Sequence, residues 1–395
     1  RHGGESAAER SRSTVVGVGH VLMQQALKTA RDQSVSVTTL PRSLWPQPVF
    51  VFRIADRLTS TGATVRSVFA GVEVLSDGSF NALLDWQLLD RLNAVLARRA
   101  LRTVVPHRYR FTALLRAGQA LRRFLPDNLS ARIPQRRPAG AWPDRPHGRR
   151  MVIWQGCVQP ALAPDINAAA ARVLDRFGIR LIAASDGCCG ALSHHMAATD
   201  EARAFMRRNI DALWPHIEAG AEALVITASG CGAHFRDYGQ LLHDDPQYRD
   251  KAKRVSELAR DIAEIVAAEW QDDMLPELPA SQRPQRIVFQ SSCSLQHGEK
   301  LNGVVESLLK RAGFKLMPVT YSFMCCGAAG TYSLLQRTLS ESLRARKLET
   351  LMASRPAAIA TANIGCLTHL ALASPVPVHH WIEMLDARLS AGDTR

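Results

Sequence analysis

The sequence predicts an α/β protein with two pseudo-symmetric units, each built on a parallel sheet, preceded by a mainly helical region. Two observations support this fold class. Residues 151–395 contain an approximate internal duplication with an offset of about 135 residues. Within each copy, short β-rich runs alternate with helical segments, which is typical of parallel sheets joined by right-handed crossovers.

The duplication rests on four sequence landmarks that occur in the same order in both copies. Residues 151–157, 172–182, 187–190 and 227–231 match residues 286–293, 307–317, 324–327 and 361–366, respectively. The β-rich runs of the first copy are 151–154, 180–183 and 223–227, and those of the second are 286–289, 315–319 and 357–361. We expect a first unit over 151–285 and a second over 286–395.

The first 150 residues divide into two regions of different character. Residues 1–80 contain one predicted strand, over 48–54, and otherwise no sustained period, so we treat them as an undefined N-terminal region. From residue 81 apolar residues recur at spacings of three, four and seven, and a second stretch of this kind covers 111–124, which predicts two helices with one buried face each. A Pro- and Arg-rich linker over 133–150 completes a basic helical linker region over 81–150.

The positive charge of the chain comes from one segment. The formal net charge is +13, and residues 91–150 hold 15 basic and 2 acidic side chains. This excess favours docking to an acidic partner subunit or an anionic membrane surface, and a solvated helix face stays open as an alternative. We do not expect nucleic-acid binding, because no recognisable module is present and Tyr109, Phe111 and Phe124 are too few interleaved aromatic residues.

Composition and cysteine usage indicate the compartment. The chain is 46% hydrophobic and 22% charged, it has no run of eighteen apolar residues, and it lacks an apolar segment of the secretory type. We therefore expect a cytoplasmic protein, either free or peripheral at the inner face of the cell membrane. Thiols stay reduced in that compartment, so patterned cysteines indicate metal or redox sites rather than disulfides.

Eight cysteines follow the predicted strands in a repeated order. They are Cys157, Cys188, Cys189 and Cys231 in the first unit, and Cys293, Cys325, Cys326 and Cys366 in the second. The carboxyl ends of parallel strands meet at one sheet edge, so we expect each set to assemble there. Gly190 and Gly327 allow a tight turn after each Cys-Cys pair, near a helix N-terminus where a thiolate is favoured.

Four thiols, with one histidine in each unit, form a metal-ligand set. His234 and His369 follow Cys231 and Cys366 by three residues and are the weaker ligand candidates. Thiolates select zinc or iron–sulfur clusters, and adjacent cysteines are accommodated more readily by a cluster with several irons than by one tetrahedral zinc. Two other functions stay open, a zinc-stabilised or metal-free assembly scaffold and a thiol–disulfide enzyme.

Other polar residues near the cysteines have two interpretations. We interpret His194 and His195 as solvent-facing rather than catalytic. Residues His297, Glu299 and Lys300 either line a site or cap a helix. His379 and His380 precede an amphipathic helix and are interpreted as core and cap residues.

Several motifs resemble proteins with a duplicated cysteine-rich CCG domain, a group that includes heterodisulfide reductase subunits and lactate-utilisation proteins. The motifs are residues 156–162, 227–232, 293–301, 325–333, 361–366 and 380–383. Within that group the chain is similar to the iron–sulfur subunits of glycolate dehydrogenase, also called glycolate oxidase, over about residues 81–390. The resemblance implies an electron-transfer subunit with iron–sulfur clusters of the [4Fe–4S] type. It also implies partner subunits that carry FAD and oxidise glycolate to glyoxylate, with electrons passing to quinone or another carrier.

Two departures from the family pattern matter for function. The family's CCG pattern ends in Cys-x-x-Cys, whereas both units here end in Cys-x-x-His, at His234 and His369. The family subunit also begins with a ferredoxin-like domain that carries two cysteine runs, whereas residues 1–156 contain no cysteine. We expect residues 1–80 to stand in place of that domain as a degenerate or out-of-frame replacement, which would impair the electron relay.

Overall fold

The computed structural model describes residues 96–126, 130, 133–184, 187–271, 274–275 and 284–391, together with the backbone of four short strands nearer the N-terminus. The chain divides into two compact units, Arg1–Leu96 and Ala97–Arg395. In the first unit, β1 (Ser36–Thr39) pairs antiparallel with β2 (Phe50–Arg53), and β3 (Glu73–Val74) pairs antiparallel with β4 (Phe80–Asn81). Strand β2 confirms the strand predicted over 48–54.

Helices are present within residues 81–150 where the structure describes this region, but the helix over Arg108–Leu121 has no buried residue, so the predicted buried face is wrong there. Residues 96–104 are helical, α3 covers Arg108–Leu121, and the 3₁₀ helix η1 covers Arg122–Phe124. The helical region starts later than residue 81, because β4 includes Asn81, and the apolar period over 82–95 lies outside the described residues. Residues 133–147 have no regular secondary structure.

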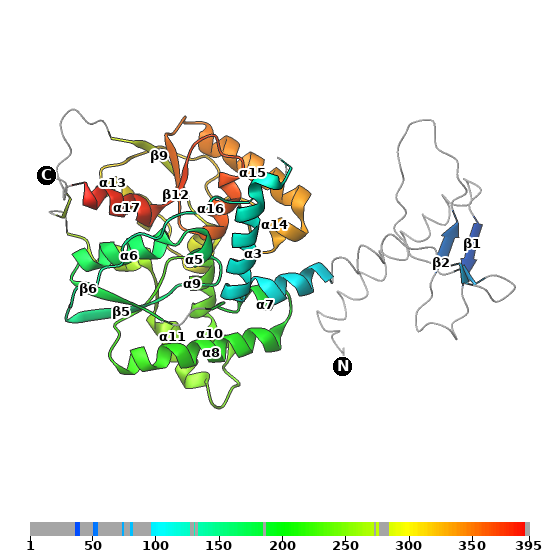
Figure 1. Cartoon of the computed structure of the whole chain (residues 1–395), viewed down its shortest axis with the longest axis horizontal. Coiled ribbons are helices and arrows are strands. Elements are labelled where there is room, and N and C mark those ends of the chain that lie inside the picture. Colours follow the sequence, from blue (N-terminus) through cyan, green and yellow to red (C-terminus); the bar gives the residue numbers. More distant parts are fainter. Residues whose placement is uncertain are drawn as a thin grey trace, which may run out of the picture. The chain divides into compact units, whose positions relative to one another are not determined.

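The second compact unit contains two four-stranded sheets, and every strand pair in them is parallel (Figure 1). The first sheet has the order β6-β5-β7-β8, with β5 (Arg149–Trp154), β6 (Ile179–Ala183), β7 (Leu224–Ile226) and β8 (Ala259–Asp261). The second has the order β10-β9-β11-β12, with β9 (Arg286–Gln290), β10 (Lys315–Leu316), β11 (Ala358–Thr361) and β12 (Val378–His380). The predicted duplicated α/β fold is therefore confirmed.

Helices connect the strands in the same order in both four-stranded sheets. The first has α5 (Gln159–Leu162), α6 (Asp165–Arg176), α7 (Ala191–His195), α8 (Thr199–Glu218), α9 (Ser229–Arg236), α10 (Tyr238–Leu241), α11 (Arg249–Leu258) and α12 (Ile262–Glu269). The second has the π-helical turn η3 (Ser294–Gly298), α13 (Val304–Arg311), α14 (Tyr332–Leu335), α15 (Arg337–Met352), α16 (Ile364–Ala371) and α17 (Trp381–Ser390). By position, α6, α9 and α12 correspond to α13, α16 and α17.

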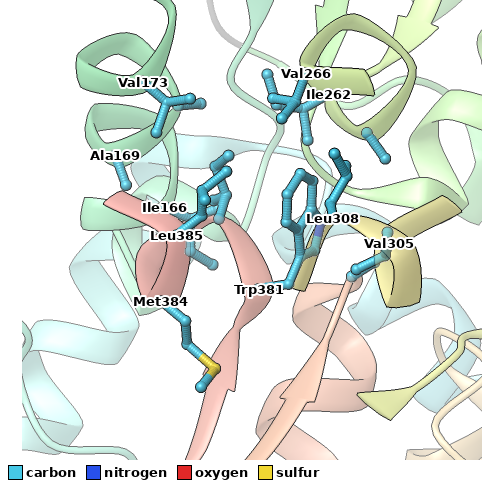
Figure 2. Packing of buried hydrophobic residues seen from close by; sticks show 14 of the residues in the cluster. Ile166, Ala169, Val173, Ile262, Val266, Val305, Leu308, Trp381, Met384 and Leu385 are labelled. Carbon is cyan, nitrogen blue, oxygen red and sulfur yellow. The ribbon is translucent and has the colours of Figure 1, made fainter. Parts of the chain in front are cut away.

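A shared apolar core joins the two halves. Helix α6 buries Ile166, Ala169, Ala170 and Val173, at spacings of three and four that place them on one face. It packs against α17, while α12 packs against α13, so corresponding helices make corresponding contacts. Figure 2 shows Trp381 of α17 among side chains from these helices. This single core contains residues of both sheets, so neither sheet has an independent core on this side.

Replacing Trp381 tests how much this core contributes to folding. The side chain is fully buried, so we expect Trp381→Ala to lower the free energy of unfolding by about 3–5 kcal/mol through lost burial and a residual cavity. Urea titration followed by circular dichroism measures this loss. The control is Leu372→Ala, whose side chain is 49% exposed and whose replacement should change stability by less than about 0.5 kcal/mol.

Candidate metal centres

The strand ends place the two cysteine sets at corresponding positions. Cys157 and Cys293 lie three residues beyond the ends of β5 and β9. Cys231 and Cys366 are the third residues of α9 and α16, which begin just after β7 and β11. The amide groups of a first helical turn and the helix dipole both favour a thiolate at such a position. Both sets therefore lie at the carboxyl edges of their sheets, as the strand pattern predicts.

In the first set the four thiols contact one another in sequence. Cys157 hydrogen-bonds to Cys188, Cys188 to Cys189, and Cys189 to Cys231. In the second set Cys293 bonds to Cys325, and Cys325 to Cys326; the Sγ of Cys326 lies 3.2 Å from that of Cys366. The contacts form a chain of thiols in each set. Within the described ranges, no three His, Cys, Asp or Glu side chains are arranged as ligands of a single metal ion.

The glycine after each Cys-Cys pair is required by its backbone conformation. Gly190 has φ 98° and Gly327 has φ 89°, both in the left-handed region. Their amides donate to the sulfur atoms of Cys188, at 3.4 Å, and Cys325, at 3.3 Å. A Cβ at Gly327 would lie 2.5 Å from the carbonyl oxygen of Ser340. The turn thus needs glycine both for its dihedral angle and for the close approach of α15.

The crowded thiols divide into one acidic and several weakly acidic members. Hydrogen bonds from Cys157 and Cys189 hold the pKa of Cys188 well below its usual range. In the second set, bonds from Cys293 and Cys326 lower the pKa of Cys325 to about 2. Cys157 and Cys189 have raised pKa values, first because they donate to neighbouring thiols and then because they are buried. All four thiols of a set can ionise together only if a cationic group compensates their charge.

The two candidate histidine ligands have different surroundings. His234 is buried, its Nε2 has no hydrogen-bond partner, and its ring centroid lies 5.4 Å from that of His194. Burial, with smaller contributions from His194 and His195, lowers the pKa of His234 to about 4, so its imidazole is neutral. By contrast, Nε2 of His369 lies 3.1 Å from Oγ of Ser340, a group that also donates to the carbonyl of Gly327. His369 therefore contributes to the packing of α15 on the Cys-Cys-Gly turn.

The structure also places the remaining candidate residues. His195 is exposed and His194 is half-buried beside His234, so only His195 matches the solvent-facing prediction. His297 and Lys300 are exposed. His380 is fully buried and caps α17, where its Nδ1 accepts from the amide of Ile382, which confirms the core and cap interpretation for this residue.

Glu299 neither lines an exposed loop nor caps a helix. Glu299 is 4% exposed. It lies beside Asp261, the last residue of β8 in the first sheet, whose side chain is itself 1% exposed. A side chain at position 232 would overlap Glu299, so Gly232 of α9 gives it room beside Cys231. Burial, reinforced by the neighbouring carboxyl of Asp261, raises the pKa of Glu299 far above its usual range.

Hydrogen bonds connect the loops that carry the two sets. The Oγ of Ser229, two residues before Cys231, lies 2.8 Å from Oγ of Ser292 and 2.7 Å from Oγ of Ser294. Asn363, three residues before Cys366, donates from Nδ2 to the same Ser229 oxygen at 3.2 Å. One serine thus joins residues that flank three of the cysteine positions, and these hydrogen bonds link the two cysteine sets.

Three residues that support the cysteine loops are absent from the sequence prediction. Asn209 donates to the carbonyl oxygen of Cys188 at 2.9 Å, and Tyr238 donates to that of Cys189 at 2.5 Å. Lys347, 1% exposed, donates to the carbonyl of Ser322 at 2.9 Å, and burial lowers its pKa against the opposing effect of the nearby thiols. A lysine between Arg346 and Glu349 on a helix gives no sequence signal of burial.

Comparison with known proteins identifies the family. The model of the cysteine-rich CCG domain matches residues 151–236 and 287–371. The glycolate oxidase iron–sulfur subunit of Escherichia coli is 47% identical over 296 residues, which cover 74% of this chain and 72% of that protein. The chain belongs to this family of iron–sulfur subunits. The family resemblance read from the motifs is therefore confirmed.

More distant family members match a smaller part of the chain. A probable glycolate oxidase iron–sulfur subunit from Bacillus subtilis is 28% identical over 63% of this chain and 55% of its own length. Lactate utilization protein A from Geobacillus kaustophilus is 24% identical over 60% of this chain and 99% of its own length. Among the described residues, the family fold here includes no helix long and apolar enough to cross a membrane.

Two glycines with positive φ allow a matched test of the turn. Gly327→Ala combines a left-handed dihedral angle with a clash against Ser340, so we expect it to lower the free energy of unfolding by at least about 3 kcal/mol. Gly330 has φ 60°, and a Cβ at this position would have no neighbouring atom within 4 Å, so Gly330→Ala should cost about 1–2 kcal/mol. Urea unfolding of both variants measures the difference, and equal losses would contradict the steric argument.

The raised pKa of Glu299 predicts a pH-dependent stability. The folded state keeps this carboxyl protonated while the unfolded state releases its proton above about pH 4.3, so stability falls as pH rises above that value. Glu299→Gln removes the titration and keeps the shape, and should raise the free energy of unfolding at pH 7 by up to about 3 kcal/mol. Unfolding curves from pH 5 to 9 measure the slope, with the exposed Glu349→Gln as control.

Proposed function

We propose that this chain is an iron–sulfur electron-transfer subunit of a dehydrogenase that oxidises glycolate or a related 2-hydroxy acid. The observation that carries the proposal is the convergence of four thiols at the carboxyl edge of each of two sheets. The names of the relatives, glycolate oxidase iron–sulfur subunit and lactate utilization protein A, support the substrate class. Electrons would pass from a reduced flavin towards quinone or another carrier.

The donor sets fit iron–sulfur clusters, and we propose the [4Fe–4S] type. Cys157, Cys188, Cys189 and Cys231 would hold one centre, and Cys293, Cys325, Cys326 and Cys366 the other. Such a group supplies one-electron redox chemistry when bound. The chain's own contribution is to supply crowded thiols, to place two of them in first helical turns, and to aim the amides of Gly190 and Gly327 at sulfur. Amide hydrogen bonds and burial tune the potential of a thiolate-ligated centre.

Of the two histidines, we propose His234 as the stronger additional ligand. Its Nε2 is buried without a partner, and its neutral imidazole is the form that binds metals. His369 uses its Nε2 on Ser340 and would have to break that contact to bind a metal. The two units would then differ in their fifth donor even though their thiols correspond.

The partners we propose are FAD-bearing subunits that carry out the substrate chemistry. Relatives named as subunits of glycolate oxidase support an assembly of several chains. In this assembly the chain would be cytoplasmic, with a peripheral contact at the inner face of the cell membrane that brings it near a quinone pool. No nucleic-acid role is proposed.

The domain division remains a proposal. We propose units over 151–285 and 286–395, a basic helical linker over 81–150, and residues 1–80 in place of a ferredoxin domain. The absence of cysteine before Cys157 supports the last point. Residues 1–156 would then supply no cysteine ligand for such clusters.

A second candidate, a thiol–disulfide enzyme, is favoured by one contact. The sulfur atoms of Cys326 and Cys366 lie 3.2 Å apart, close enough for oxidation to a disulfide to need little movement. A zinc-stabilised scaffold would use the same thiols. Metal analysis separates the three: iron with acid-labile sulfide supports the carrier, zinc alone supports the scaffold, and titratable thiols without metal support the thiol enzyme.

Single cysteine replacements test the carrier function. Each of Cys188→Ser and Cys325→Ser removes the thiol with the lowest pKa of one set, so anaerobically purified protein should lose about half of its iron and acid-labile sulfide. Iron analysis and electron paramagnetic resonance of the dithionite-reduced protein measure the loss. The exposed Ser342→Ala variant is the control. Full iron content in either cysteine variant would refute the ligand assignment.

A further inference from the structure

Helix α3 presents an apolar face to solvent. No residue of this helix is buried. Tyr109 is 86% exposed, Leu114 is 58%, Leu121 is 54%, and Phe124 of the adjoining η1 is 70%. Ala113, Ala117 and Ala120 are exposed between them. The spacings of the exposed helical residues, 109, 113, 114, 117, 120 and 121, place them on one face, so this stripe is a continuous surface.

The opposite side of α3 attaches the helix to the protein. Phe111 and Leu115 are partly buried, and the helix contacts α5. Gln119 donates from Nε2 to the carbonyl oxygen of Pro134 at 2.9 Å. The helix is thus held with its less apolar side against the body and its more apolar side outward, the reverse of an ordinary surface helix.

Arginine surrounds the exposed apolar face. Residues 97–126 contain eight Arg and no Lys, Asp or Glu. Arg110 lies on the exposed face, and Arg123 stacks on the ring of Phe124, with 4.7 Å between the guanidinium carbon and the ring centroid. Arg102 is paired with Glu201 of α8 at 2.5 Å. The segment therefore combines exposed aromatic and leucine side chains with a strong local positive charge.

We propose that the exposed face of α3 and η1 docks the chain on an anionic lipid bilayer, with the helix lying in the plane of the headgroups. Exposed aromatic and leucine residues on one face with arginines beside them are the composition of interfacial helices. The inference rests on the proposed function in one respect, since it assigns the peripheral membrane contact to a particular surface.

Length and charge both favour a helix that lies on the membrane rather than one that crosses it. Helix α3 has 14 residues, which gives about 21 Å at 1.5 Å per residue, against the roughly 30 Å of a bilayer core. Anionic lipid headgroups are mobile and can gather beneath arginines at any spacing. An acidic protein surface would instead need carboxylates at positions that match those arginines. An acidic protein partner is the competing occupant, and the experiment below distinguishes it.

Vesicle sedimentation with the whole 395-residue, metal-loaded chain tests the proposal. We expect the chain to sediment with phosphatidylglycerol–phosphatidylethanolamine vesicles, to be released by added salt, and to bind phosphatidylcholine vesicles weakly. The double variant Leu114→Asp, Leu121→Asp should lower the partition coefficient on anionic vesicles by about tenfold or more. Arg110→Gln with Arg123→Gln should weaken the salt dependence. Leu372→Asp, a similar change at a leucine that is 49% exposed on the second unit, should bind like the wild type.

Two outcomes would overturn the proposal. One is no sedimentation with anionic vesicles, as expected if the face binds an acidic protein. The other is unchanged binding by the Leu114→Asp, Leu121→Asp variant. Phe124→Trp provides a second measurement that needs no disruptive change: its added fluorescence should be quenched by brominated anionic lipids, and unquenched emission would also count against the proposal. Iron and acid-labile sulfide measured on each sample separate a failure of lipid binding from a failure of the iron–sulfur assignment.

Discussion

The apolar layer between the two sheets is the constraint on which the rest of the structure depends. Helices α6 and α12 of the first unit pack on α17 and α13 of the second, and Trp381 is fully buried among them. Because corresponding helices make corresponding contacts, this layer fixes the relative rotation of the two sheets. Their carboxyl edges, and the cysteines that follow the strands, are positioned by that rotation. Burial of apolar surface, which has no directional preference, is made specific here by the repeated spacing of three and four residues between the buried positions of α6 and α13.

Polar contacts add to the apolar layer in fixing how the two sheets are placed relative to each other. His380, fully buried at the start of α17, has its Nε2 2.9 Å from the carbonyl oxygen of Thr227, just after β7. Ser229 then connects to Ser292 and Asn363. These bonds tie the loop before Cys231 to the loops before Cys293 and Cys366. A displacement of one unit against the other would break them while they are shielded from water, which is costly for buried polar groups. The two thiol sets are therefore joined through one group of hydrogen-bonded residues.

The features that sequence can predict are those with a local or repeated signal. The strands β5, β7, β9 and β11 are short apolar runs, and the cysteines and glycines recur at matching positions. Together these two signals predict the duplicated parallel fold and the two convergent cysteine sets. Strands β8 and β12 give no such signal, because their three-residue sequences, Ala-Arg-Asp and Val-His-His, are largely polar and the strands are defined by pairing with a neighbour. Lys347 and Glu299 have ordinary surface identities, and only tertiary packing buries them. Their roles follow from contacts across the chain, which no local pattern encodes.

The pseudo-symmetry is broken at the sites, and the asymmetry has electrostatic consequences. The first set is accompanied by His234, His194, the neutral groups of Asn209 and Tyr238, and the exposed Arg208, whose guanidinium donates to the carbonyl oxygen of Cys188 at 3.2 Å. The cation beside the second set, Lys347, is buried; its ammonium group holds the loop before Cys325 and contributes to the low pKa of that thiol. The loop from the end of β10 to Cys325 is also longer than that from β6 to Cys188, and it exposes Tyr321 and Phe323. A fixed cation in a low-dielectric site favours the more negatively charged state of its neighbours. Metal centres held by the two sets would therefore have different electrostatic surroundings, and different potentials would follow.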